Sequence, residues 1–272
     1  MGISMGEEMT LSITAVARSD QGKVRSNNED SFLVRDDLAL YVVADGMGGA
    51  AAGEVASGLF VQTAEEVFLS GIKRGEHRRA LIPAAFEKAH SQIKANAQRF
   101  PGHEGMGCTA EILTFENNHY FLGHVGDSRT YRFDGKNLRQ ITTDHTYIQD
   151  QLNLGVLTPE EAKHHRLRHV LSRAVGHGNK IKVDYHSEQV TPGSVFLQCS
   201  DGLFGELSDD RITEILRDRT DLVNKTEQLV EAANEVGGRD NITVVLSHVV
   251  RNTNASGLMG ILRLWRRHWH NT

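Results

Sequence analysis

Four short strand-like runs follow one another between residues 108 and 141, with no room for a helix between them. The runs CTAEILTFE, HYFLGHV, RTYRFD and LRQI are rich in aromatic and β-branched residues, which favour strands. The sequences ENNH and DGKN, which separate the first two runs and the last two, are typical of tight turns. Because parallel neighbours need a long crossover connection, we predict that these strands form antiparallel hairpins.

Helical segments occur in pairs on either side of this strand-rich region. Their apolar residues repeat at the spacing of an amphipathic helix, as with Leu81, Ala85 and Ala89. Helix pairs set apart from antiparallel hairpins indicate an α+β fold, in which helices cover antiparallel sheets. We predict helices over residues 53–71, 79–100, 208–216 and 221–236, a short helix starting at Thr158, and further strands over residues 11–18, 38–45, 241–250 and within VTPGSVFLQCSDG.

Composition argues against several classes of protein. A net charge of -5 gives no general attraction to nucleic acid, so we expect no nucleic-acid partner. No apolar run approaches the roughly 20 residues that span a bilayer, and MGISMGEEMT lacks the pattern of a secretion signal. Two cysteines, Cys108 and Cys199, are too few for a disulfide framework. We therefore expect a cytoplasmic protein.

We predict one domain with a further segment at each end. Residues 1–8 form an N-terminal extension, and residues 9–250 carry the predicted helices and strands. Within them, residues 142–180 lose strand character and hold several histidines and basic residues. Residues 251–272 follow the last predicted strand as a basic, amphipathic tail.

Acidic residues stand at the ends of several predicted strands. Asp45, Asp127 and Asp201 each follow a strand directly, and Asp240 precedes the last one. If the strands share sheets, these ends can converge, and gathered carboxylates stay ionised only when cations offset their charge. Oxygen-rich sites of this kind suit hard ions such as Mg²⁺ or Mn²⁺. Glu29 and Asp30 lie beside a further strand in RSNNED.

Two other interpretations compete for these residues. A single Asp-Gly pair is more often a plain turn, although its recurrence at several strand ends weakens that interpretation. The stretch VVADGMGG could instead cradle a dinucleotide phosphate. That site would bring Asp45 against a phosphate of like charge, and a helix follows where a parallel strand is required, so we do not favour it.

Seven motifs follow one another along the chain: RSNNED, VVADGMGG, GCTAEI, VGDSRTYRF, LRQITTDHT, CSDGLFGELSD and GGRDNITVV. In these motifs and their order the chain resembles the bacterial form of the metal-dependent type-2C serine/threonine protein phosphatases. The resemblance covers about residues 12–250 and implies a β-sandwich of two antiparallel sheets flanked by pairs of α-helices, a four-layer α+β fold. It maps residues 142–180 onto the mobile flap beside the catalytic cleft of that family.

The resemblance implies a centre of two Mn²⁺ or Mg²⁺ ions that hydrolyses phosphoserine and phosphothreonine in proteins. Asp45 would bridge the ions, and Arg25 would grip the substrate phosphate. The glycines after Asp45 would keep bulk away from the ions and permit positive φ angles. The remaining implied metal ligands are the carbonyl of Gly46, Asp201 and Asp240, Glu29 and Asp30 acting through water, and Asp127 with Asp201 for a third, weaker ion.

The resemblance also implies a partner, since family members often reverse the work of a serine/threonine kinase in bacterial signalling. Two alternatives stay open: a phosphoprotein-binding adaptor without activity, and a phosphatase of small metabolites. An adaptor is expected to have lost metal ligands, whereas every matched position here keeps its carboxylate.

The resemblance does not assign the acid that protonates the leaving group. Some eukaryotic relatives have a histidine after the Asp-Gly pair as an acid for the leaving group, but here Met47 occupies that position and cannot donate a proton. A flap histidine is one candidate for this role.

We expect His145 to be a structural residue near the site. A zinc site has little support, because the spacing of His164, His165, His169 and His177 does not match one.

The tail GLMGILRLWRRHWHNT has apolar residues at helical spacing, with arginines between them. Such a segment can lie on an anionic membrane surface, giving a peripheral position at the inner membrane, or enter the groove of a partner protein. It can equally dock on its own domain. Amphipathic spacing alone does not identify what covers the apolar face.

Overall fold

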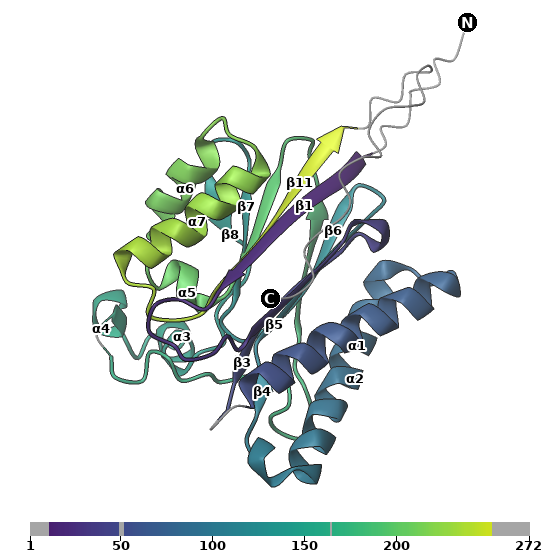
Figure 1. Cartoon of the computed structure of the whole chain (residues 1–272), viewed down its shortest axis with the longest axis vertical. Coiled ribbons are helices and arrows are strands. Elements are labelled where there is room, and N and C mark those ends of the chain that lie inside the picture. The colour runs from purple at the N-terminus through teal and green to yellow at the C-terminus, as the bar shows by residue number, and fades with distance from the viewer. Residues whose placement is uncertain (1–10, 49–51, 164, 252–272) are drawn as a thin grey trace, which may run out of the picture.

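Two antiparallel sheets pack face to face at the centre of the computed structural model, with helices on both outer faces (Figure 1). The structure describes residues 11–48, 52–163 and 165–251. The first sheet has the order β1 (Leu11–Asp20), β11 (Ile242–Arg251), β10 (Val195–Cys199), β7 (Arg129–Phe133) and β8 (Leu138–Gln140). The second has the order β2 (Asp30–Arg35), β3 (Leu40–Met47), β5 (Ala110–Glu116), β6 (His119–Val125) and β9 (Asp184–Gln189), with β4 (Gly107–Cys108) paired to β3.

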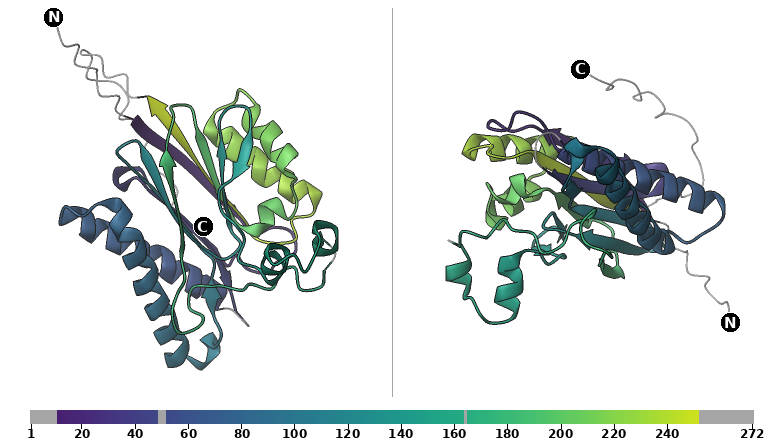
Figure 2. Two further views of the ribbon diagram at one scale, coloured as in Figure 1. Left: turned by 180° about the vertical axis from the view of Figure 1, so that it is seen from behind. Right: turned by 90° about the horizontal axis from the view of Figure 1, so that it is seen from below.

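Helices cover the outer face of each sheet. The long helices α1 (Gly53–Lys73) and α2 (Arg78–Arg99) pack on the second sheet. The first sheet is covered by α5 (Asp201–Phe204), α6 (Asp209–Arg217) and α7 (Leu222–Val236). Two short helices, α3 (Tyr147–Asn153) and α4 (Pro159–Lys163), stand off the sandwich (Figure 2). The predicted four-layer α+β architecture is confirmed.

Three buried layers hold these elements together. Successive residues of β3 point to different layers: Val42 packs with α1 and α2, whereas Tyr41 and Val43 pack between the sheets. All three are fully buried, and full burial of one large apolar side chain contributes roughly 1.5–3 kcal/mol. This explains why residues 38–45 read as a continuous apolar run, since β3 has no face left for solvent.

Both predicted hairpins are present. The β5–β6 turn uses Asn117 and Asn118 with φ angles of 49° and 59°, and asparagine tolerates this left-handed region better than most residues. The β7–β8 turn is held by Asp134 Oδ1, which accepts hydrogen bonds from the N–H groups of Lys136 and Asn137. Between β6 and β7, however, the chain crosses from the second sheet to the first. That crossing carries Asp127.

Side chains cap several helix starts. Ser208 and Asp221 accept hydrogen bonds from the N–H groups of Arg211 and Asn224. Thr158, at the predicted start of a short helix, forms a reciprocal capping box with Glu161. Across the described residues, no helix combines the length and apolar character needed to cross a bilayer. The sequence did not predict β9, because DYHSEQ is a polar, largely exposed edge strand with little apolar pattern.

Candidate metal centre

Asp30 and Asp45 face each other across neighbouring strands of the second sheet. They are register partners in the β2–β3 ladder, and Asp30 is buried with 9% of its surface exposed. The carbonyl of Glu29 accepts a hydrogen bond of 3.1 Å from the N–H of Gly46. The end of β3 therefore brings three predicted site residues beside Asp45.

Gly46 is required by close packing of backbone against backbone. A Cβ atom at Gly46 would lie 2.1 Å from the carbonyl oxygen of Gly53 and 2.5 Å from that of Glu29. A Cβ atom at Gly53 would lie 2.8 Å from Cδ of Glu29. The prediction of positive φ is wrong for Gly46 and Gly48, which are absent from the described glycines with positive φ. Gly49 lies outside the described residues.

The first sheet supplies the other carboxylates. Asp201 begins α5 directly after β10, and Asp240 lies just before β11. Arg25, in the loop between β1 and β2, donates a hydrogen bond of 2.6 Å to Asp240 Oδ2. Nearly half of the Arg25 side chain is exposed, so its guanidinium can meet a ligand from solvent while it holds Asp240.

Ser200 joins the two halves of the cluster. Its Oγ donates a hydrogen bond of 2.7 Å to Asp30 Oδ2 and accepts one of 3.0 Å from the N–H of Thr243 on β11. The other carboxylate oxygen of Asp30, Oδ1, is buried without a hydrogen-bond partner among the described residues. A buried oxygen in that state indicates that an electropositive partner belongs beside it.

The carboxylates share one electrostatic environment. Burial raises the pKa of Asp45 well above its ordinary value, and the charges of Asp30, Asp201, Asp127 and Asp240 raise it further. Burial, followed by the charges of Asp127 and Asp240, raises the pKa of Asp201 to about 8. Carboxyl groups from both sheets thus lie close enough to disfavour one another's ionised form.

Three further carboxyl groups have raised pKa values, each with burial as the largest cause. Burial is the main cause for Asp30, whose pKa rises to about 6. The pKa of Asp127 also rises to about 6, first through burial and then through the charge of Asp144. Burial and the charge of Glu54 raise the pKa of Glu29. All the predicted carboxylates are therefore brought to one region.

Those carboxylates do not form a closed cage. Within the described part of the chain, no group of three or more His, Cys, Asp or Glu side chains has the arrangement of a metal-binding set. The side chains interact through their charges, and hydrogen bonds from Ser200 and Arg25 hold Asp30 and Asp240 to the protein. The donor chemistry, all oxygen and anionic, fits Mn²⁺ or Mg²⁺ and not zinc.

Thr109 and Ser128 position the acidic residues, and the sequence interpretation missed both. Thr109 Oγ1 accepts a hydrogen bond from the N–H of Asp45, the N–H of Thr109 donates to the Asp45 carbonyl, and the two hydroxyls lie 2.6 Å apart. Thr109 falls inside the motif GCTAEI, which offers a weak signal. Ser128 and Ser200 offer none beyond standing next to Asp127 and Asp201.

His145 is used at both ring nitrogens. Its Nδ1 accepts a hydrogen bond of 3.1 Å from the N–H of Gly126, and its Nε2 lies 3.1 Å from Asp184 Oδ2. Its own N–H donates to the Gly126 carbonyl over 2.7 Å. Burial, followed by the charge of His124, lowers the pKa of His145 to about 4. The neutral imidazole therefore fastens the turn that bears Asp127.

The other histidines of residues 142–180 show no metal-binding arrangement within the part of the segment that the structure describes. His165 Nδ1 accepts a hydrogen bond from the N–H of Leu167, and His177 Nε2 lies 3.1 Å from the Gly105 carbonyl. His164 lies outside the described residues.

Comparison with known proteins identifies the family. A family model described as protein phosphatase 2C matches residues 21–247. The serine/threonine protein phosphatase PstP of Mycobacterium tuberculosis is 40% identical over 242 residues, which are 89% of this chain and 46% of that protein. The chain thus spans about half the length of that relative. The serine/threonine phosphatase stp of Listeria welshimeri is 32% identical over 245 residues, covering 88% of this chain and 96% of that protein.

A solved structure agrees with these matches. The catalytic domain of PstP, crystallised in complex with two manganese ions, superposes with a TM-score of 0.79 at 38% identity, covering 89% of this chain and 100% of that one. Family model, relatives and fold lead to one conclusion: the chain belongs to the protein phosphatase 2C family.

Proposed function

We propose that the chain hydrolyses phosphoserine and phosphothreonine in proteins at the carboxylate cluster, with Mn²⁺ or Mg²⁺ as its cofactor. One observation carries the proposal: carboxylates from the strand ends of both sheets gather beside an exposed arginine, with Asp30 opposite Asp45, Ser200 bonded to Asp30 and Arg25 bonded to Asp240. Membership of the family and the manganese-bound PstP domain support it.

The residues that would hold two ions are those predicted from the motifs. Asp45 would bridge them, with the Gly46 carbonyl, Asp201 and Asp240 completing the set. Glu29 and Asp30 would act through water, and Asp127 with Asp201 would serve a third, weaker ion. When bound, the ions supply Lewis acidity and lower the pKa of water toward neutrality.

The chain's own residues supply substrate binding and orientation. Arg25 would donate two parallel hydrogen bonds to the phosphoryl oxygens, because its planar guanidinium matches that geometry. Ser200 and Thr109 hold Asp30 and Asp45 in place through the hydrogen bonds described above. Met47 cannot donate a proton, so a different group protonates the leaving alkoxide, and a flap histidine is a candidate.

The adaptor and small-metabolite alternatives make different predictions in solution. An adaptor binds phosphopeptides without releasing phosphate, and a metabolite phosphatase prefers sugar phosphates to phosphopeptides. A bacterial serine/threonine kinase is the partner that we expect to supply the substrate. A cytoplasmic location, peripheral attachment to the inner membrane and the absence of a nucleic-acid partner remain predictions from sequence.

Phosphate release tests the proposal. The wild type, Asp201→Asn and Asp210→Asn would be assayed on p-nitrophenyl phosphate, a phosphothreonine peptide and a sugar phosphate, each with Mn²⁺ or EDTA. Asp210 is an exposed residue of α6 and serves as the matched control. We expect hydrolysis of the peptide by the wild type and by Asp210→Asn with Mn²⁺ only. Release no greater than that of Asp201→Asn would instead favour the adaptor.

A further inference from the structure

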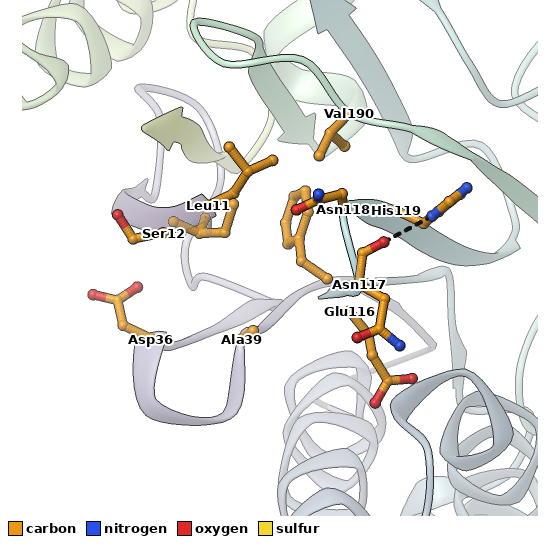
Figure 3. Close-up of a pocket in the computed structure, with 11 residues that line it drawn as sticks. Leu11, Ser12, Asp36, Ala39, Glu116, Asn117, Asn118, His119 and Val190 are labelled. Carbon is orange, nitrogen blue, oxygen red and sulfur yellow. Dashed lines mark hydrogen bonds between the residues drawn. The ribbon is translucent and has the colours of Figure 1, made fainter. Parts of the chain in front are cut away.

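A pocket of about 620 Å³ opens at the end of the sandwich opposite the carboxylate cluster (Figure 3). The β1–β11 ladder fixes this placement: Asp20 pairs with Ile242 at the carboxylate end, and Leu11 pairs with Arg251 at the other. Leu11 lines the pocket. No residue assigned to the metal centre lines it, so the pocket is distinct from the proposed site of hydrolysis.

The pocket is the open end of the core between the sheets. Phe115 and Val190 belong to that core, and Leu11, Ile13 and Ala39 pack against it. All five also line the pocket. Figure 3 shows the side chains of Leu11 and Val190 reaching it from different segments. Apolar side chains that continue a core to an open edge gain stability when another apolar segment covers them.

The charge of the lining restricts the occupant. Asp36 and Glu116 are the acidic residues of the lining, and lysine and arginine are absent from its described lining. Asp36 accepts a hydrogen bond from Tyr41. The Glu116 carboxylate lies on the side of the helices (Figure 3), 3.3 Å from His77 and 3.7 Å from Arg78. A segment with apolar and basic residues would complement this lining better than an acidic one.

We infer that the pocket is the docking site of residues 252–272 of the same chain. These residues lie outside the described part of the structure, and they continue directly from Arg251, the strand partner of Leu11. Leu258 is seven residues further on, a reach of up to roughly 3.3 Å per residue, which is ample for the chain to turn back. The segment has no Asp or Glu, and its apolar and basic residues include Leu258, Ile261, Leu262, Trp265 and Trp269 with Arg263, Arg266 and Arg267.

The other segment that adjoins the pocket fits less well. Residues 1–10 join at Leu11 and contain Glu7 and Glu8 without any lysine or arginine. Their carboxylates would stand near those of Asp36 and Glu116, and like charges disfavour such a contact. A membrane surface would bind the same basic, tryptophan-containing segment, but it offers no reason for an open core at this end of the sandwich.

Tryptophan fluorescence tests the inference on the full chain. The protein has two tryptophans, Trp265 and Trp269, so the whole emission reports on this segment. For the wild type without lipid, we expect emission to the blue of the urea-unfolded chain and restricted quenching by iodide. Leu11→Asp should move the emission to the red and raise the quenching constant at least twofold.

A matched control separates docking from unfolding. Leu154→Asp makes the same change at a leucine of residues 142–180 that is 73% exposed, and it should leave the emission unchanged. Reversal of Arg263, Arg266 and Arg267 to glutamate should reproduce the red shift without touching residues 11–251. Far-UV circular dichroism checks the fold of each variant, and the fluorescence result does not depend on phosphatase activity.

Three results would overturn the inference. One is wild-type emission equal to that of the unfolded chain and unaltered by Leu11→Asp. A second is a blue shift that appears only with phosphatidylglycerol vesicles and not with phosphatidylcholine vesicles, which would assign the segment to a membrane. The third is emission that changes with protein concentration, which would assign it to a second copy.

Discussion

Asp30 on β2 stands directly opposite Asp45 on β3, as register partners in an antiparallel ladder. Like charges directly opposite in a sheet are destabilising, and here burial adds to the effect by disfavouring both ionised forms. Ser200 offsets part of this through its hydrogen bond to Asp30 Oδ2, while Asp30 Oδ1 has no partner among the described residues. The strand pair therefore places negative charge where a cation would relieve it.

Replacement of Asp201 by asparagine should make the metal-free protein more stable. It should also remove most of the stabilisation that Mn²⁺ gives to the wild type. Burial and neighbouring carboxylates disfavour the ionised form of Asp201, so the neutral variant should melt higher in EDTA. We expect a rise of roughly 3–6 °C, since 1 kcal/mol corresponds to about 2–4 °C in a domain of this size. Mn²⁺ should raise the melting temperature of the wild type and of Asp210→Asn, but raise that of Asp201→Asn little. Calorimetry showing equal shifts in all three proteins would exclude Asp201 as a ligand.

Substitution of Gly46 by alanine should destabilise the fold although it removes no contact. The added methyl would overlap the Gly53 and Glu29 carbonyls, and overpacking of this kind costs about 1–3 kcal/mol or more. Gly58→Ala is the control, because a Cβ atom there meets nothing within 4 Å in the middle of α1. That variant should gain up to about 1 kcal/mol. Urea unfolding measures both, and an unaffected Gly46→Ala would contradict the packing argument.

Arg25→Ala should weaken phosphate binding with little effect on folding. The exposed Arg25–Asp240 pair contributes about 0–1 kcal/mol to stability. A charge-assisted hydrogen bond to substrate contributes roughly 1.5–3 kcal/mol, so kcat/KM for a phosphopeptide should fall about 10- to 100-fold. Arg25→Lys should recover part of this loss, because it keeps the charge and lacks the planar fork. An unchanged kcat/KM, measured beside Arg211→Ala as the surface control, would remove Arg25 from the site.

His145 should make the protein less stable as the pH falls below 6.5. The folded-state pKa of His145 is lowered to about 4, so between these values the unfolded chain binds a proton that the folded chain does not. Stability is then present above pH 6.5 and lost on acidification, by about 1–2 kcal/mol between pH 7 and pH 5. His145→Asn should flatten that part of the profile, whereas the exposed His77→Gln should not. Parallel profiles for the wild type and His145→Asn would refute the assignment.

Local chemistry explains why the architecture could be predicted. Paired asparagines in ENNH and the Asp-Gly pair in DGKN encode their hairpins within four residues, and β3 shows its burial as an unbroken apolar run. By contrast, β9 is polar and is held by pairing with β6. No local signal marks a strand whose stability comes from its neighbour.

Some site residues are marked by a local motif, whereas others are placed only by tertiary packing. Asp45 and Asp201 could be proposed because each stands at a strand end within a recognisable motif. Thr109, Ser128 and Ser200 act through hydrogen bonds to residues far away in the chain, as Ser200 does with Asp30. Such partners are fixed by the packing of two sheets, which no single stretch of sequence contains. The close approach of Gly46 to Gly53 depends on that packing too.

Anomalous diffraction from crystals grown with Mn²⁺ tests the central claim most directly. We predict two strong manganese peaks beside Asp45, one of them also contacting Asp201 and Asp240 and the other the Gly46 carbonyl. Crystals of Asp201→Asn should lose occupancy at the first position. A map of well-diffracting wild-type crystals without manganese peaks between Asp45, Asp201 and Asp240 would contradict the account.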